Sequence, residues 1–336
     1  MKALLVIVAV VVGLLVSLEV GLRLLGFGRP PLYIADREIG YLLAPNQSTR
    51  RFGNRIAIND YSMRSGQTTK ERPTSTLRVL LLGDSVANGA WWTDQDDIIS
   101  VLLSSQLEPL LQNSSGASSS SQTSFESVEV LNASANSWGP RNELAYLKRF
   151  GLFGVNALVL LINTDDLFST APTSLPVGRD RNYPSSKPPL GIIEALSRLL
   201  PYRPPSEMAV VNTEPGDRVG FNLEAIQQIK LLADAADAKF LLAMTPLLRE
   251  IGEPGPRDYE LTARTRLDQF SQEQQISYLD FLPIFNSREA PEKLYRDHIH
   301  LSTKGNQTVS EQIGGSLQPL LLPVGSSTTL DQTILQ

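Results

Sequence analysis

The sequence predicts an α/β protein with three layers, built on a mostly parallel sheet of about five strands and preceded by one hydrophobic N-terminal helix. Three observations support this fold class. Short unbroken apolar runs, such as residues 79–82 and 157–162, are typical of strands buried on both faces of a parallel sheet. These runs alternate with longer stretches of helical periodicity, as in βαβ units. The chain also begins with a long apolar stretch.

That N-terminal stretch, residues 3–18, is apolar apart from Gly13 and Ser17. At about 1.5 Å per residue it is somewhat short for a hydrocarbon layer of about 30 Å. Extending it to residue 27 gives the required length but includes Glu19 and Arg23, which can pair at i, i+4 near the interface. We expect residues 1–27 to be a single-pass membrane anchor, with the rest of the chain in the periplasm.

A cleaved signal peptide is the alternative interpretation of the same stretch. Lys2 and the apolar run both fit a signal peptide. No small-x-small cleavage site follows the run, however, which favours the anchor.

Composition limits the classes of partner. The 336 residues are 42% hydrophobic, enough for a sizeable core, and the net charge of −5 argues against nucleic acid as a partner. The chain has no cysteine, which excludes disulfides and thiolate metal sites, and its two histidines lie in one short stretch. We therefore expect no metal and no cofactor.

Residues 28–74, which follow the anchor, are polar and rich in turn-forming pairs such as Pro45-Asn46 and Asn59-Asp60. We expect this juxtamembrane segment to pack against the main domain, residues 75–319, and to space it from the bilayer.

Two distant stretches carry residues with catalytic chemistry. Residues 78–89 place Ser85 directly after a buried strand that ends at Gly83, at the sheet edge where open α/β sheets bind ligands. Residues 295–305 contain Asp297 and His300, whose spacing lets the carboxylate orient the imidazole. A serine hydroxyl needs such an oriented base to act as a nucleophile. We expect Ser85, His300 and Asp297 to form a triad. We expect His298 to be a packing or rim residue and not the base, because Asp297 immediately precedes it and cannot easily reach its ring.

The Gly-Asp-Ser stretch and the Asp-x-x-His pair together resemble the GDSL esterase/lipase family, also called SGNH hydrolases, over roughly residues 75–318. The resemblance implies a flavodoxin-like fold and a serine esterase or O-acyltransferase. The expected substrate is an ester, and an envelope location suggests an O-acetylated polysaccharide or a lipid. The alternative is a catalytically impaired binding or scaffold protein of the cell envelope.

The resemblance also implies an oxyanion hole with two backbone donors. One is the N–H of Ser85. The other comes from a position five residues beyond Asn132, where the family usually has glycine and this chain has Ser137. Since the donor is the backbone N–H, a serine in place of glycine can still donate. Its side chain affects how closely a substrate approaches the site.

The third donor in the family is an asparagine side chain, and here its position is occupied by Asp165. An ionised carboxylate would repel the oxyanion, and loss of such a donor typically costs about 10²- to 10³-fold in rate. Three interpretations remain open. Asp165 stays protonated, or Asn163 supplies the donor from the same side of an extended segment, or the enzyme is slow or inactive.

The remaining elements complete the alternating pattern. We expect helices at residues 97–111, 142–150, 221–238, 256–275 and about 302–317, and strands at 125–132, 157–162, 239–245 and 276–281. Segments 169–189 and 201–217 are expected to be insertions over the site, and Trp91 and Trp92 either line it or belong to the core. The serine-rich residues 113–124 are expected to form a mobile loop, and residues 320–336 a flexible tail.

Overall fold

The computed structural model describes residues 1–114 and 125–321, so the serine-rich loop and the C-terminal tail expected from the sequence lie almost wholly outside the described residues. Its centre is a five-stranded parallel sheet with the order β6-β5-β7-β8-β9. The strands are β5 (Thr76–Gly83), β6 (Ser127–Ser134), β7 (Ala157–Asn163), β8 (Lys239–Thr245) and β9 (Ser277–Asp280). This is the flavodoxin-like order, and the predicted fold class is confirmed.

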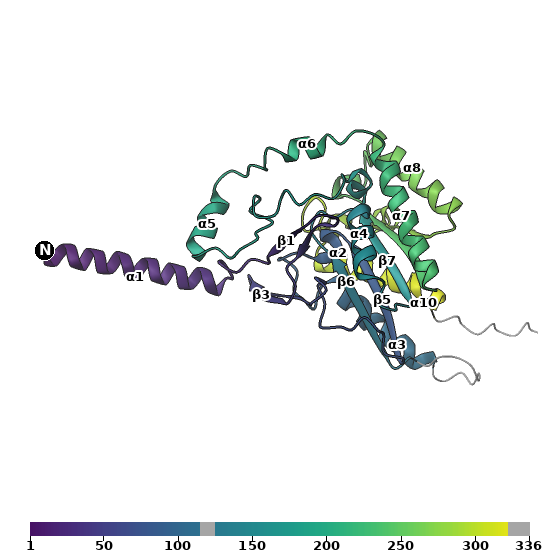
Figure 1. Cartoon of the computed structure of the whole chain (residues 1–336), viewed down its shortest axis with the longest axis horizontal. Coiled ribbons are helices and arrows are strands. Elements are labelled where there is room, and N and C mark those ends of the chain that lie inside the picture. Colours follow the sequence, from purple (N-terminus) through teal and green to yellow (C-terminus); the bar gives the residue numbers. More distant parts are fainter. Residues whose placement is uncertain (115–124, 322–336) are drawn as a thin grey trace, which may run out of the picture.

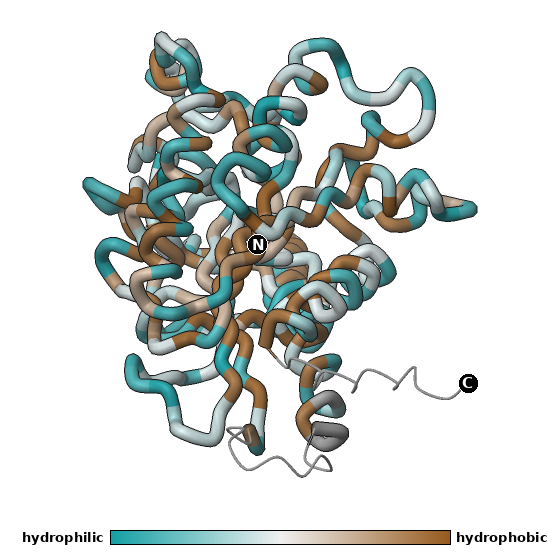
Figure 2. The backbone as a smooth tube through the Cα atoms, turned by 90° about the vertical axis from the view of Figure 1, so that its right-hand side faces the viewer, coloured by the Kyte–Doolittle hydropathy of each residue, from teal (hydrophilic) through white to brown (hydrophobic). Residues whose placement is uncertain are grey.

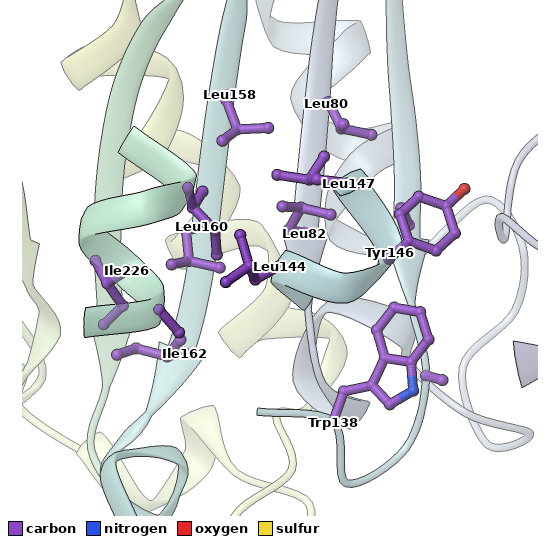
Figure 3. Packing of buried hydrophobic residues seen from close by; sticks show 14 of the residues in the cluster. Leu80, Leu82, Trp138, Leu144, Tyr146, Leu147, Leu158, Leu160, Ile162 and Ile226 are labelled. Carbon is purple, nitrogen blue, oxygen red and sulfur yellow. The ribbon is translucent and has the colours of Figure 1, made fainter. Parts of the chain in front are cut away.

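Helices cover both faces of the sheet, because side chains on each strand alternate between two cores. On one face Leu80 and Leu82 of β5 pack with residues of α4 (Pro140–Phe150), α7 (Arg218–Ala235) and α8 (Asp258–Glu273) (Figure 3). On the other face Val79 and Leu81 pack with α3 (Ile99–Ser114), α9 (Phe281–Asn286) and α10 (Thr303–Leu321). Hydrophilic turns lie around the outside of the domain (Figure 2).

Val101 and Leu102 of α3 are half-buried, and the fully buried positions of this helix are Ile99, Leu103 and Leu107. These three repeat every four residues, so they form one row along the helix that faces α10 and β6.

The N-terminal helix α1 (Lys2–Leu24) projects from the domain as a single rod with no buried residue (Figure 1). Its length and hydropathy are sufficient to cross a membrane, although a signal sequence would have the same properties.

The juxtamembrane segment forms two antiparallel hairpins that the sequence pattern did not indicate. They pair β1 (Tyr33–Asp36) with β2 (Gly40–Leu43), and β3 (Gln47–Arg51) with β4 (Asn54–Ile58). Tyr41, Ile56 and Met63 are buried in the same core as α4 and α7. Residues 33–63 therefore pack against the main domain and share its core.

The segment between β7 and α7 contains short helices within an extended path. They are η1 (Thr164–Phe168), α5 (Gly191–Leu199) and α6 (Met208–Asn212). In Figure 1, α5 lies beside the last turns of α1 and α6 lies on the arch that returns to the main domain. Three further short helices are α2 (Ser85–Asn88), η2 (Leu248–Glu250) and η3 (Pro291–Leu294).

Candidate active site

Ser85 begins the one-turn helix α2 at the carboxyl end of the inner strand β5. Gly83 is required there, because a Cβ at this position would lie 2.5 Å from the carbonyl oxygen of Leu161. Asp84 caps α2 by accepting a 2.8 Å hydrogen bond from the N–H of Val86, and its other carboxylate oxygen lies 3.1 Å from Ser85 Oγ. Ser85 Oγ is also within hydrogen-bonding distance of the loop that precedes α10.

The side chains of Ser85, His300 and Asp297 form one continuous line of hydrogen bonds. Ser85 Oγ lies 2.9 Å from His300 Nε2, and His300 Nδ1 lies 2.9 Å from Asp297 Oδ2. Partial burial would raise the pKa of Asp297, but hydrogen bonds from the N–H groups of His300 and Ile299 and from the imidazole outweigh burial and lower that pKa. The carboxylate therefore stays ionised and orients the imidazole.

Neighbouring residues hold the loop of His300 in place. The bridge between Tyr295 and Leu301 closes the loop, and the ring of Trp92 packs edge-on against His300 with centroids 4.4 Å apart. The side chain of His298 is 82% exposed, and its Nδ1 lies 3.8 Å from Asp297 Oδ1. His298 therefore lies on the outside of the loop, away from Ser85.

Ser85 and His300 both line a cavity of about 740 Å³. Trp91 and Trp92 line it too, and so do residues of both segments expected over the site, among them Tyr183 and Tyr202. Aromatic rings alternate with amide, hydroxyl and charged groups around this cavity. The cavity can therefore hold both an apolar group and a polar one.

Ser137 lies on the wall of the same cavity, in the turn that follows β6. Its φ of 57° is in the left-handed region, which favours glycine, the residue that the resemblance implies here. The hydroxyl of Tyr183 donates a 2.8 Å hydrogen bond to Ser137 Oγ, and that of Tyr41 donates a 2.6 Å hydrogen bond to the carbonyl of Asn136. Two tyrosines thus fix a turn that a non-glycine residue must strain to adopt.

Asn163 and Asp165 do not face the same side. The strand β7 ends at Asn163 and η1 begins at Thr164, so the two-residue periodicity of a strand does not extend to Asp165. Asn163 is buried, and its side-chain nitrogen lies 2.9 Å from both Asp84 Oδ2 and Asp166 Oδ2. Asp165 is exposed, and neither Asp165 nor Asn163 lines the cavity.

A family model, described as the GDSL-like Lipase/Acylhydrolase family, matches residues 81–308. The chain belongs to this family. It is a hydrolase that acts on ester bonds, and Ser85 and His300 both fall within the matched range.

Solved structures similar to this GDSL hydrolase include the lipase/acylhydrolase from Enterococcus faecalis. The two sequences are 10% identical, the match covers 74% of this chain and 98% of that chain, and the TM-score is 0.44. A GDSL-like lipase from Bacteroides thetaiotaomicron is also 10% identical, with 73% and 89% coverage and a TM-score of 0.41. A search of curated proteins gives no match.

Three buried carboxyl groups lie beneath the nucleophile of this GDSL hydrolase. Burial raises the pKa of Asp84, of Asp166 and of Glu143, and repulsion by the charge of Asp84 adds to the shift for the other two. Both carboxyl oxygens of Glu143 are buried and have no hydrogen-bond partner in the part of the chain that the structure describes. Glu143 therefore favours its protonated form, a property that its place in an ordinary amphipathic helix did not indicate.

Arg64 is a second residue that the sequence did not single out. It is fully buried and donates hydrogen bonds to the carbonyl oxygens of Asn88, Ala90 and Thr93, in the loop that carries the two tryptophans. The only sequence signal is an arginine close to the Asn59-Asp60 turn, and nothing local predicts that it inserts beside the nucleophile.

Proposed function

We propose that this GDSL hydrolase is a membrane-anchored serine esterase in which Ser85 is the nucleophile. Ser85 Oγ attacks the acyl carbonyl while His300 Nε2 takes its proton, and Asp297 stabilises the imidazolium that results. The imidazolium then gives that proton to the leaving alcohol oxygen, and an acyl-serine remains. Water, or a sugar hydroxyl in an acyl transfer, attacks the acyl-serine while His300 again accepts a proton. The observation that carries this proposal is the continuous hydrogen-bonded line from Ser85 to Asp297.

The N–H groups of Ser85 and Ser137 are the proposed backbone donors to the oxyanion. Both residues line the cavity. Among the described residues, the N–H of Ser137 donates to no protein acceptor, so it is available to a bound substrate. A preorganised donor of this kind stabilises the charge that develops in the transition state.

For the third donor, Asn163 is the better-placed candidate. Its amide donates to Asp84 Oδ2, the carboxylate oxygen that lies 3.1 Å from Ser85 Oγ, so Asp84 alone separates it from the nucleophile. In the free protein both of its amide hydrogens are directed at carboxyl groups, so donation to an oxyanion requires the release of one of them. We propose no role in the reaction for Asp165.

The proposed domain organisation keeps residues 1–27 as an anchor, residues 28–74 as a juxtamembrane segment, and residues 75–319 as the hydrolase domain, in the periplasm. Contacts between the end of α1 and the domain support retention of the anchor. Arg23 donates to the carbonyl of Pro189 at 2.9 Å, and Arg51 donates to the carbonyl of Gly26 at 3.1 Å. Only cleavage beyond Gly26 would remove both contacts.

The proposed substrate is an ester in the cell envelope, on an O-acetylated polysaccharide or on a lipid. The mixture of aromatic and polar groups in the cavity is compatible with an acyl group attached to a sugar or to a lipid headgroup. Transfer to a sugar hydroxyl and hydrolysis share the same acyl-serine.

Turnover of a short-chain aryl ester by the purified full chain tests the proposal. Ser85→Ala should abolish it, whereas Ser105→Ala, which removes an exposed hydroxyl on α3, should leave it unchanged. Equal turnover in the two variants would remove Ser85 from the mechanism.

A further inference from the structure

The helix α5 presents a row of exposed apolar side chains. Five residues in and around it are between 45% and 81% exposed: Leu190, Ile193, Leu196, Leu199 and Leu200. Most of them recur every three or four residues, so they share one side of the helix. Contiguous exposed apolar surface of this kind marks a contact with a partner or a membrane.

One end of α5 is fixed to the base of the anchor. The carboxylate of Glu19, in the last turns of α1, accepts hydrogen bonds from the N–H groups of Gly191 at 2.8 Å and Ile192 at 3.0 Å. A carboxylate at this position also interacts favourably with the dipole of α5. The first turn of α5 therefore lies beside the end of the apolar part of α1, as Figure 1 shows.

The polar side of α5 faces the folded domain. Glu194 is buried, forms a 2.8 Å ion pair with the buried Arg51 of β3, and accepts a 2.7 Å hydrogen bond from the N–H of Gly28. Because a buried pair of this kind is strongly destabilised when one partner is removed, it fixes the rotation of the helix. The apolar row is consequently directed away from the domain.

We propose that α5 lies in the membrane interface beside the anchor, with its apolar row in contact with lipid. This inference depends on the proposed retention of α1 as a membrane anchor. The bilayer is the favoured occupant because the apolar row lies beside a helix that is apolar from residue 3 to residue 18 and has no buried residue. An amphipathic helix held in this position is the usual form of an interfacial membrane contact.

The position of α5 also identifies the class of substrate. Arg198 of α5, Tyr202 and Pro30 line the same cavity as Ser85 and His300. The cavity therefore extends from the nucleophile to the side of the domain that α5 holds at the membrane. The substrate is an ester carried by a membrane amphiphile, either a lipid or a lipid-linked glycan.

The absence of cysteine from the chain allows a direct test with single-cysteine variants. Leu196→Cys and the control Leu231→Cys, an equally exposed position on the remote helix α7, are each labelled with an environment-sensitive fluorophore in the full chain. The labelled chains are placed in phospholipid nanodiscs that contain doxyl-labelled lipid. The fluorophore at position 196 should shift to the blue and be quenched by the lipid, and the one at position 231 should do neither.

A fluorophore at position 196 that remains in water would overturn the proposal. So would a blue shift without lipid quenching, because protein would then cover the row. A second measurement tests the substrate class: Leu196→Ser/Leu199→Ser should lose at least fivefold in turnover of a vesicle-embedded ester and none on a soluble aryl ester. Equal loss on both substrates would contradict the substrate assignment. If no variant turns over any ester, the esterase proposal fails, while lipid quenching still decides the membrane contact.

Discussion

The guanidinium of Arg64 donates a 2.6 Å hydrogen bond to the carbonyl oxygen of Asn88, at the end of the short helix that Ser85 begins. The same group donates to the carbonyl oxygens of Ala90 and Thr93. A side chain from the juxtamembrane segment thus supports the loop between the nucleophile and the cavity wall. Burial lowers the pKa of Arg64 to about 10, so it remains charged at neutral pH.

Arg64→Met should therefore destabilise the whole domain. It leaves three carbonyl oxygens without their donor, each loss costing about 1–3 kcal/mol, so we expect a decrease of at least about 3 kcal/mol in the free energy of unfolding by urea. Arg55→Met is the control, because Arg55 pairs with Asp94 and Asp96 at the surface and should cost at most about 1 kcal/mol. Similar losses in the two variants would show that Arg64 has no special role.

Substitutions at Ser137 should separate the role of its backbone N–H from that of its side chain. Ser137→Gly keeps the N–H and suits a φ of 57°, so we expect turnover within about threefold of the original. Ser137→Val places a β-branched residue in the left-handed region and should displace the N–H, with a loss of about 10²- to 10³-fold in kcat. Steady-state kinetics with thermal melts test this. Loss of activity in the glycine variant would instead assign the role to the hydroxyl.

Asn163 and Asp165 should respond differently to substitution. Asn163→Ala removes the amide that bridges Asp84 and Asp166 and should lower kcat by at least about tenfold. Asp165→Asn changes an exposed side chain outside the cavity and should leave kcat within about twofold. A large gain in the Asp165 variant would mean that its charge impairs the oxyanion hole in solution.

Glu143 should make stability depend on pH in a defined direction. Burial raises its pKa well above 4.5, so the folded protein keeps a proton that the unfolded chain releases. Its contribution to stability is complete below about pH 4.5 and is lost, by up to about 1.4 kcal/mol per pH unit, as the pH rises toward the folded pKa.

Glu143→Gln cannot titrate and should avoid this loss. Urea unfolding at pH 5 and pH 8 should show the variant gaining stability over the original protein as the pH rises. Asp84 and Asp166 titrate in both proteins, so their contributions largely cancel in the difference between the two free energies of unfolding. A constant difference between the two pH values would show that Glu143 is not the titrating group.

The inner strands β5, β7 and β8 could be predicted because they are seven or eight residues long and almost wholly buried. Leu80, Leu82 and Leu160 belong to unbroken apolar runs, and that signal needs no tertiary information. The hairpins at 33–58 could not be predicted, because β1 and β2 are four residues long and pair only with each other. Their burial depends on the domain on which they pack.

The residues of the site also divide into those that the sequence predicts and those that it does not. Ser85, Asp297 and His300 stand in short motifs, and the chain has only two histidines from which to choose a base. The relation between Asn163 and Asp165 depends on where β7 ends, a boundary that sequence patterns locate poorly. Arg64 meets its acceptors more than twenty residues away, and no local pattern encodes that contact.

Reaction of the full chain with a fluorophosphonate at neutral pH tests the central claim most directly, because only an activated serine reacts. We predict one phosphonyl adduct, located by mass spectrometry on the peptide that contains Ser85, and none in His300→Ala. A folded protein that forms no adduct at Ser85, or one that is labelled equally fast without His300, would contradict the proposed nucleophile and base, and would favour a binding or scaffold protein.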